Sequence, residues 1–197
     1  MERREVLAFT GSPRKGGNTE TLVAAVMNGV ARSGAGAETI RLPDLAIAPC
    51  IGCGGCQKSG HCVIIDDMQG LYPKILAAQT IIIASPIYFY GLTAQTKIFV
   101  DRNQALWSRK QLLLAAHQWR IDPSKKGYLV SVAATRGEKV FVGAQLTAQY
   151  TFDAMGLGYG GDFLVRGVDQ RGEMKKMTDR LVEAEAFGYR ICCEKRG

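Results

Sequence analysis

Short apolar segments alternate along the chain with longer amphipathic ones, and this alternation predicts an α/β fold. The short segments, composed of β-forming residues, predict five strands at 6–9, 38–42, 80–85, 127–133 and 163–166. The amphipathic segments predict five helices at 19–33, 68–78, 94–107, 139–155 and 173–193. Because strands and helices alternate, we expect βαβ units and a parallel sheet. The length fits a single domain spanning residues 1–197.

Two of the predicted helices carry further signals. In the last helix, apolar or small residues recur every three or four positions, so that one face can be buried: Met174, Met177, Leu181, Ala184, Gly188 and Ile191. Asp66 and Asp67 precede the helix at 68–78 and can cap its free N–H groups, which leaves them no need of a catalytic role. Pro73 can shorten or kink the same helix. Residues 107–126 show no clear pattern.

Composition and charge exclude several classes of protein. No apolar run approaches the roughly 18 residues that cross a bilayer, and the N-terminal residues do not resemble a signal peptide, so we expect a cytoplasmic protein without a membrane span. The net charge is +7, but the basic residues are interleaved with acids and form no long stripe. We therefore expect no nucleic-acid binding, although a positive surface suits a phosphorylated cofactor or an acidic redox partner.

The loop after the first strand has the composition of a phosphate-binding loop. Its candidate residues combine short polar side chains, a flexible backbone and one positive charge: Ser12, Arg14, Gly17, Asn18 and Thr19. A helix begins directly afterwards and supplies N–H groups and the positive end of its dipole. The loop lacks both the P-loop signature and G-x-G-x-x-G, so the monophosphate of FMN fits better than a dinucleotide. A solvent-facing glycine-rich turn is the alternative.

Two other loops follow predicted strands and could face the same ligand. The third strand leads into Pro86, Ile87, Tyr88, Phe89 and Gly91, and the fourth leads into Thr135 and Arg136. The aromatic residues could pack against a flat ring system, and the second loop could supply hydrogen bonds or positive charge to a reducible flavin edge. Aromatics turned into the core and an ordinary turn are the respective alternatives. Loops after strands one, three and four point to one crevice.

Four cysteines form a compact motif between the second strand and the second helix. Cys50, Cys53, Cys56 and Cys62 have the spacing C-x2-C-x2-C-x5-C, and the intervening glycines allow turns that could bring four thiolates together. This spacing indicates a metal site. A zinc site, disulfides or a loop that holds no metal are the alternatives.

The other cysteines and histidines fall outside this ligand set. Four thiolates complete it without His61, and Cys192 and Cys193 lie too far along the sequence to join the motif by spacing. We predict that these two cysteines are packing or exposed thiols.

These loops resemble those of the NADPH-dependent FMN reductase family of flavodoxin-like proteins. The similarity rests on residues 10–19, on 85–89 and on 94–102, and it weakens after about residue 110. It implies a doubly wound five-stranded parallel sheet in the order 2-1-3-4-5 with helices on both faces. It also implies that Ser12, Arg14, Asn18 and Thr19 hold the FMN phosphate and that residues 86–89 line the isoalloxazine. Lys97, Asp101 and Arg102 would be structural or interface residues.

The cysteine motif resembles that of the iron-sulfur flavoproteins, a branch of this family. The resemblance implies that the four cysteines of the motif bind a 4Fe-4S cluster. It further implies electron transfer between a low-potential donor and an acceptor, with ferredoxin or another redox carrier and a small-molecule acceptor as partners, in a homodimer or homotetramer. NAD(P)H remains a candidate donor.

No side chain is predicted to be catalytic, because the chain shows no Ser-His-Asp arrangement or paired carboxylates and contains only two histidines, His61 and His117. Two alternatives to the iron-sulfur flavoprotein stay open. One is a cluster-free FMN-dependent NAD(P)H:quinone or flavin reductase, and the other is a non-enzymatic flavodoxin-like electron carrier.

Overall fold

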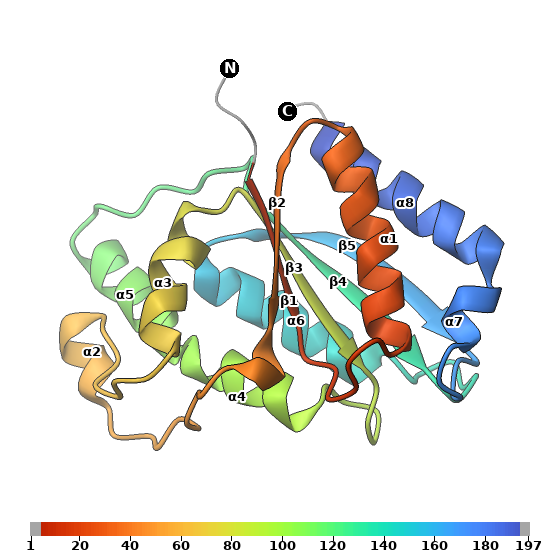
Figure 1. Ribbon diagram of the computed structural model, residues 1–197. Helices are drawn as coiled ribbons and strands as arrows, with labels where there is room; N and C mark the ends of the chain where they lie inside the picture. Colours follow the sequence, from red (N-terminus) through yellow and green to blue (C-terminus); the bar gives the residue numbers. More distant parts are fainter. Residues whose placement is uncertain (1–4, 194–197) are drawn as a thin grey trace.

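A five-stranded parallel sheet forms the centre of the protein in the computed structural model, which describes residues 5–193 (Figure 1). Its strands are β1 (Glu5–Thr10), β2 (Gly36–Arg41), β3 (Thr80–Pro86), β4 (Lys126–Ala133) and β5 (Gly158–Arg166). They lie in the order β2-β1-β3-β4-β5, and every neighbouring pair is parallel. The predicted doubly wound, flavodoxin-like fold is therefore confirmed.

Helices cover both faces of the sheet (Figure 1). One layer contains α1 (Asn18–Arg32), α7 (Glu173–Lys176) and α8 (Thr178–Cys193). The other contains α3 (Met68–Ala77), α4 (Ala94–Arg102), α5 (Gln104–Ala115) and α6 (Val142–Met155). The segment between β2 and α3 adds the short 3-10 helix η1 (Leu42–Asp44) and α2 (Gly55–Ser59).

The central strands are apolar on both faces because each face has its own core. Along β1, Val6 and Ala8 pack on the α1 and α8 side, whereas Leu7 and Phe9 pack on the side of α3, α4 and α6. This alternation follows from the two-residue period of a strand. It explains why the inner strands appear in the sequence as continuous apolar runs.

Two glycines allow α1 and α8 to approach closely. A Cβ atom at Gly29 would lie 1.9 Å from the carbonyl oxygen of Glu185, and one at Gly188 would lie 1.9 Å from that of Val26. No larger side chain fits between the two backbones. The glycine that the periodicity places on the buried face of the last helix is therefore a contact point between helices.

Two predicted helices are each divided in the structure. The segment 94–107 contains the end of α4 and the start of α5, with Asn103 between them, where a buried side-chain amide donates to the carbonyl of Phe99 (2.8 Å). The segment 173–193 is divided at Met177, whose backbone angles (φ −90°, ψ 63°) are not helical. Helix α5 extends to Ala115, within the segment that showed no clear pattern.

Several other boundaries also differ from the sequence prediction, most of them by one or two residues. Helix α6 begins at Val142 instead of residue 139, and β5 begins at Gly158 instead of residue 163. The first residues of β5 are rich in glycine, which has low strand propensity, so the sequence pattern does not indicate a strand there. This part of β5 pairs with β4 with a register irregularity at Gly127/Tyr128. Pro73 lies inside α3, which ends at Ala77.

Candidate cofactor sites

Buried hydroxyl groups connect the carboxyl ends of three strands. Thr93, the N-cap of α4, donates from Oγ1 to the carbonyl of Gly11 after β1 (2.7 Å). Its backbone N–H donates to Ser85 Oγ at the end of β3 (3.1 Å), and Ser131 Oγ of β4 donates to the carbonyl of Ser85 (2.6 Å). Thr93, Ser85 and Ser131 are at most 1% exposed. The ends of β3 and β4 and the loops after β1 and β3 are thus held in a fixed relation to one another.

Gly11 is required by this close packing. A Cβ atom at this position would lie 1.8 Å from Thr96 Oγ1 and 3.1 Å from Thr93 Oγ1. Any side chain at residue 11 would push the loop after β1 away from the start of α4. The glycine next to the first strand therefore serves the packing between loops.

The first loop and the loop after β3 line one small cavity, of about 100 Å³. Eight residues predicted to bind the cofactor contribute to it: Ser12, Arg14, Gly17, Asn18, Thr19, Pro86, Ile87 and Tyr88. Gly17 is the N-cap of α1 and provides no side-chain cap, so the first N–H groups of this helix are left for another acceptor. Together with Arg14, this helix end suits an anionic group.

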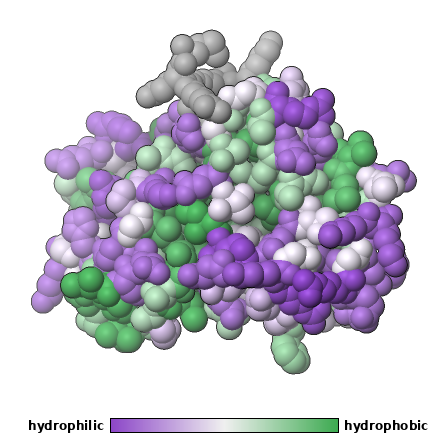
Figure 2. Space-filling view, in the orientation of Figure 1, coloured by the Kyte–Doolittle hydropathy of each residue, from purple (hydrophilic) through white to green (hydrophobic). Residues whose placement is uncertain are grey.

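The other four predicted residues do not line this cavity. Phe89 and Gly91 belong to a tight loop, closed by reciprocal backbone hydrogen bonds between Tyr88 and Gly91, that projects from the surface (Figures 1 and 2). Phe89 is fully exposed and has a left-handed backbone (φ 49°), so the alternative in which it turns into the core is wrong. Thr135 and Arg136 lie in an exposed loop after β4.

The structure gives Asn18 a role that the sequence did not reveal. Its Oδ1 accepts hydrogen bonds from the backbone N–H groups of Gly172 (3.1 Å) and Met174 (3.2 Å), and its Nδ2 donates to the carbonyl of Gln170 (2.8 Å). Asn18 thus connects the first loop to the loop after β5. That second loop adds Val168 and Asp169 to the cavity, and no local pattern could have paired residues so far apart in the chain.

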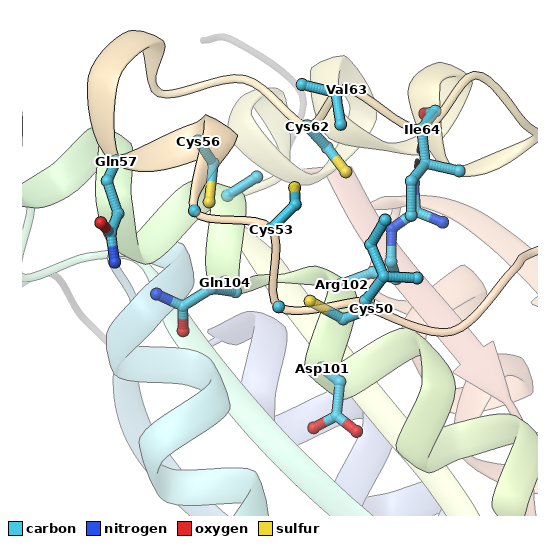
Figure 3. A pocket seen from close by; sticks show the side chains of 14 residues that line it. Cys50, Cys53, Cys56, Gln57, Cys62, Val63, Ile64, Asp101, Arg102 and Gln104 are labelled. Carbon is cyan, nitrogen blue, oxygen red and sulfur yellow. Dashed lines mark hydrogen bonds between the residues drawn. The ribbon is translucent and has the colours of Figure 1, made fainter.

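The four motif cysteines line a second hollow, of about 410 Å³, between residues 46–66 and the start of α5 (Figure 3). We call residues 46–66 the cysteine loop. Gly52 (φ 65°) and Gly54 (φ 71°) adopt left-handed conformations that turn the backbone around the thiols. Cys56 lies on α2, which is attached to α5 by a hydrogen bond from Ser108 Oγ to Cys56 Sγ (3.4 Å). Figure 3 shows the four sulfur atoms around this hollow.

These thiols share a hollow, yet they do not form a closed ligand set. All four are free, and within residues 5–193 no three or more His, Cys, Asp or Glu side chains are arranged to hold a metal ion. The chemistry of the donor set nevertheless fits an iron-sulfur cluster, since four thiols face one space of sufficient size. The same loop also exposes three apolar residues, Ile51, Val63 and Ile65.

Asp66 and Asp67 organise the C-terminal end of the cysteine loop. Asp66 Oδ1 accepts from the N–H of Met68 (3.0 Å), which confirms its predicted capping of α3, and Oδ2 accepts from Ala48 (2.9 Å). Asp67 makes no such cap and accepts instead from the N–H of Ala46 (2.7 Å). Burial opposes the charge of Asp66, but Arg102 and these N–H groups outweigh it, so the pKa of this carboxyl lies below its ordinary value.

Comparison with known sequences identifies similar proteins. A profile of the NADPH-dependent FMN reductase family matches residues 4–154. An iron-sulfur flavoprotein of Methanocaldococcus jannaschii is 39% identical over 132 residues, which cover 67% of this chain and 63% of that protein. An iron-sulfur flavoprotein of Methanosarcina thermophila is 35% identical over 132 residues, covering 67% and 64%. The chain thus spans less than two thirds of the length of these two relatives.

Solved structures share the fold at lower identity. An NAD(P)H:quinone oxidoreductase from Methanothermobacter marburgensis superposes with a TM-score of 0.71 at 12% identity, over 99% of this chain and 98% of that one. At this identity the likeness concerns the fold alone. Among residues 5–193, no helix combines the length and apolar character that a membrane crossing demands.

Proposed function

Because the chain belongs to the NADPH-dependent FMN reductase family, we propose that it is an iron-sulfur flavoprotein that transfers electrons between a low-potential donor and an acceptor through FMN and a 4Fe-4S cluster. Family membership supports the enzyme class predicted from the sequence, an FMN-dependent oxidoreductase. The observation that carries the rest is the cysteine motif, because all four of its thiols line one hollow on a flavodoxin-like scaffold.

In this proposal FMN binds in the cavity lined by the loops after β1 and β3, which we call the strand-end cavity. Ser12, Arg14, Gly17 and Thr19 lie around the start of α1 and would bind the phosphate. Asn18 would act indirectly, by holding the loop after β5 against them.

The flavin ring would lie against residues 86–88, which line the same cavity. Phe89 and Gly91 would flank the ring from the projecting loop, and Thr135 and Arg136 would supply polar contacts at its edge. These four residues do not line the cavity in the structure, so their assignment requires the bound flavin to reach beyond it.

The cysteine loop would hold the cluster through Cys50, Cys53, Cys56 and Cys62. FMN exchanges one or two electrons and an iron-sulfur cluster one at a time, so the pair can connect two-electron and single-electron partners. We propose ferredoxin or another redox carrier as one partner, with a small molecule as acceptor. NAD(P)H remains a candidate donor, and the assembly would be a homodimer or homotetramer. Free cysteines suit a reducing, cytoplasmic location.

The test is the iron, acid-labile sulfide and flavin content of protein purified and reconstituted without oxygen. We expect about four irons and one FMN per chain. FMN without iron would overturn the cluster and favour the second candidate, a cluster-free NAD(P)H:quinone or flavin reductase, which the open arrangement of the thiols also suits. Anaerobic bleaching of the flavin by NAD(P)H, compared with bleaching by a reduced protein carrier, distinguishes the donors.

A further inference from the structure

Arg102 is a buried cation beside the cysteine hollow that electron transfer by itself does not explain. It is the last residue of α4, it lines the hollow, and only 1% of its surface is exposed. Burying a guanidinium is costly unless charged and hydrogen-bonding partners surround it. Its partners therefore indicate what the side chain does.

The guanidinium contacts both ends of the cysteine loop. Nη1 donates to the carbonyl of Ala48 (2.8 Å), two residues before Cys50, and to Asp66 Oδ2. Nη2 donates to Asp66 Oδ1 (3.1 Å) and to the carbonyl of Ile64 (3.4 Å), two residues after Cys62. Asp66 completes the connection by accepting from the N–H of Ala48. The two-pronged shape of arginine suits this geometry, because its donors are fixed in one plane.

Arg102 itself is firmly attached to the core. Three residues earlier on α4, Phe99 is completely buried and packs on Phe9 of β1, with ring centroids 4.5 Å apart. Tyr72 of α3 donates from its hydroxyl to the backbone carbonyl of Arg102 (2.9 Å). The Arg102 side chain therefore connects the segments next to Cys50 and Cys62 to the packed core of the sheet.

Arg102 also has unused capacity. Its Nε atom is buried and has no hydrogen-bond partner among the described residues, although nearly all buried donors are paired in native proteins. Asp66 offsets the charge but interacts with the terminal nitrogens only. An anionic group in the hollow would gain from the nearby positive charge.

We propose that Arg102 is the positioning residue of the cysteine loop: it fixes the separation between Cys50 and Cys62 and places a positive charge beside the four thiols. This inference rests on the proposed function. Groups that orient metal ligands from behind affect metal binding strongly even though they do not touch the metal. A nearby positive charge also makes addition of an electron to a cluster more favourable, which raises the reduction potential.

Two substitutions separate the geometric role from the charge. Arg102→Lys keeps the charge and loses the two-pronged contact, whereas Arg102→Gln loses both. We expect both variants to load iron about 10-fold less readily than the wild type. In the fraction that loads, the midpoint potential of the cluster should be more negative in Arg102→Gln and close to the wild-type value in Arg102→Lys. A purely structural arginine would not produce this difference.

The same proteins without metal test the loop directly. Amide hydrogen exchange at Ala48 should become about 10-fold faster in both variants, because the Asp66 carboxylate that accepts from this N–H loses its orientation. Asp66→Asn, which leaves Arg102 in place, should have the same effect and replaces Arg102→Gln if that variant does not fold. Arg32→Gln is the matched control, since Arg32 forms an exposed ion pair with Glu185 on α8, in the layer that covers the other face of the sheet.

The outcomes distinguish this inference from the proposed function. Unchanged exchange and iron loading in the Arg102 and Asp66 variants, alongside a wild type that carries the cluster, would overturn the positioning role alone. Equal potentials in the two Arg102 variants would overturn the role of the charge. A wild type that takes up no iron would overturn the proposed function, and the exchange rates would then decide whether Arg102 positions the loop.

Discussion

The strand-end cavity and the cysteine loop both follow carboxyl ends of strands in the same sheet, but they are held in different ways. The cavity is formed by short loops that a buried hydroxyl network fixes across β1, β3 and β4. The cysteine loop runs through residues 46–66 with only the five-residue helix α2, and it is connected to the core by a few side chains at its ends and by the hydrogen bond between Ser108 of α5 and Cys56 of α2. The shape of the strand-end cavity is thus fixed by the sheet, whereas the shape of the cysteine loop depends on a few side-chain contacts and on the group that it would hold.

The largest expected effect is at the cysteine loop. Cys53→Ser should remove most of the iron and sulfide, because a hydroxyl is a poor ligand for iron in a cluster, and it should leave FMN binding intact. Metal and flavin analysis of the reconstituted variant measures both. Cys193→Ser provides the control, since Cys193 is exposed and lies outside the motif. Equal iron in Cys53→Ser and the wild type would contradict the ligand assignment.

The next effect concerns the strand-end cavity, where a substitution should weaken FMN binding and not iron loading. Gly11→Ala forces a Cβ atom to within 1.8 Å of Thr96 Oγ1, so we expect a loss of about 1–3 kcal/mol in the free energy of unfolding and weaker FMN binding. Urea unfolding and flavin titration test this.

Gly70→Ala is the matched control for that experiment. Gly70 is exposed on α3, and a Cβ atom there would meet nothing within 4 Å, so this change should be neutral or stabilising. Equal stability of the two variants would show that the loops are less tightly coupled than the hydroxyl network indicates.

A smaller effect tests how far the cavity depends on distant loops. Asn18→Ala removes three hydrogen bonds to residues 170–174, and we expect a cost of about 1–2 kcal/mol together with faster hydrogen exchange in that loop. Asn18→Asp keeps the acceptor toward Gly172 and Met174 and should retain part of the protection. Unaltered exchange in Asn18→Ala would return Asn18 to the direct phosphate role predicted from the sequence.

The features that could be predicted from the sequence depend on local patterns, and those that could not depend on contacts between distant segments. The strands, the candidate loops after β1 and β3 and the cysteine motif could be predicted from periodicity, glycine placement and spacing, whereas the strand order was implied by the family resemblance. The bonds of Asn18 to residues 170–174 and the attachment of Arg102 to the cysteine loop join segments far apart in the sequence, and no local pattern records them. The division at Asn103 was missed because a buried amide, and not a proline or glycine, ends the helix.

The smallest effect lies away from both sites and sharpens the comparison by giving the stability of the scaffold itself. Burial and a hydrogen bond to Asp162 (2.8 Å) raise the pKa of Tyr159 above its ordinary value of 10.0. The folded protein therefore keeps this proton at a pH where the unfolded chain loses it, so the contribution is complete below pH 10 and is lost as the pH rises further. Tyr159→Phe should cost about 1 kcal/mol near neutral pH and reduce the loss of stability between about pH 10 and about pH 11. Urea unfolding across this range measures the slope, and Tyr150→Phe, at an exposed position, controls for removal of a hydroxyl. The same slope in Tyr159→Phe and the wild type would exclude Tyr159 as the group responsible, and alkaline changes in flavin or iron content would then have to arise at the sites themselves.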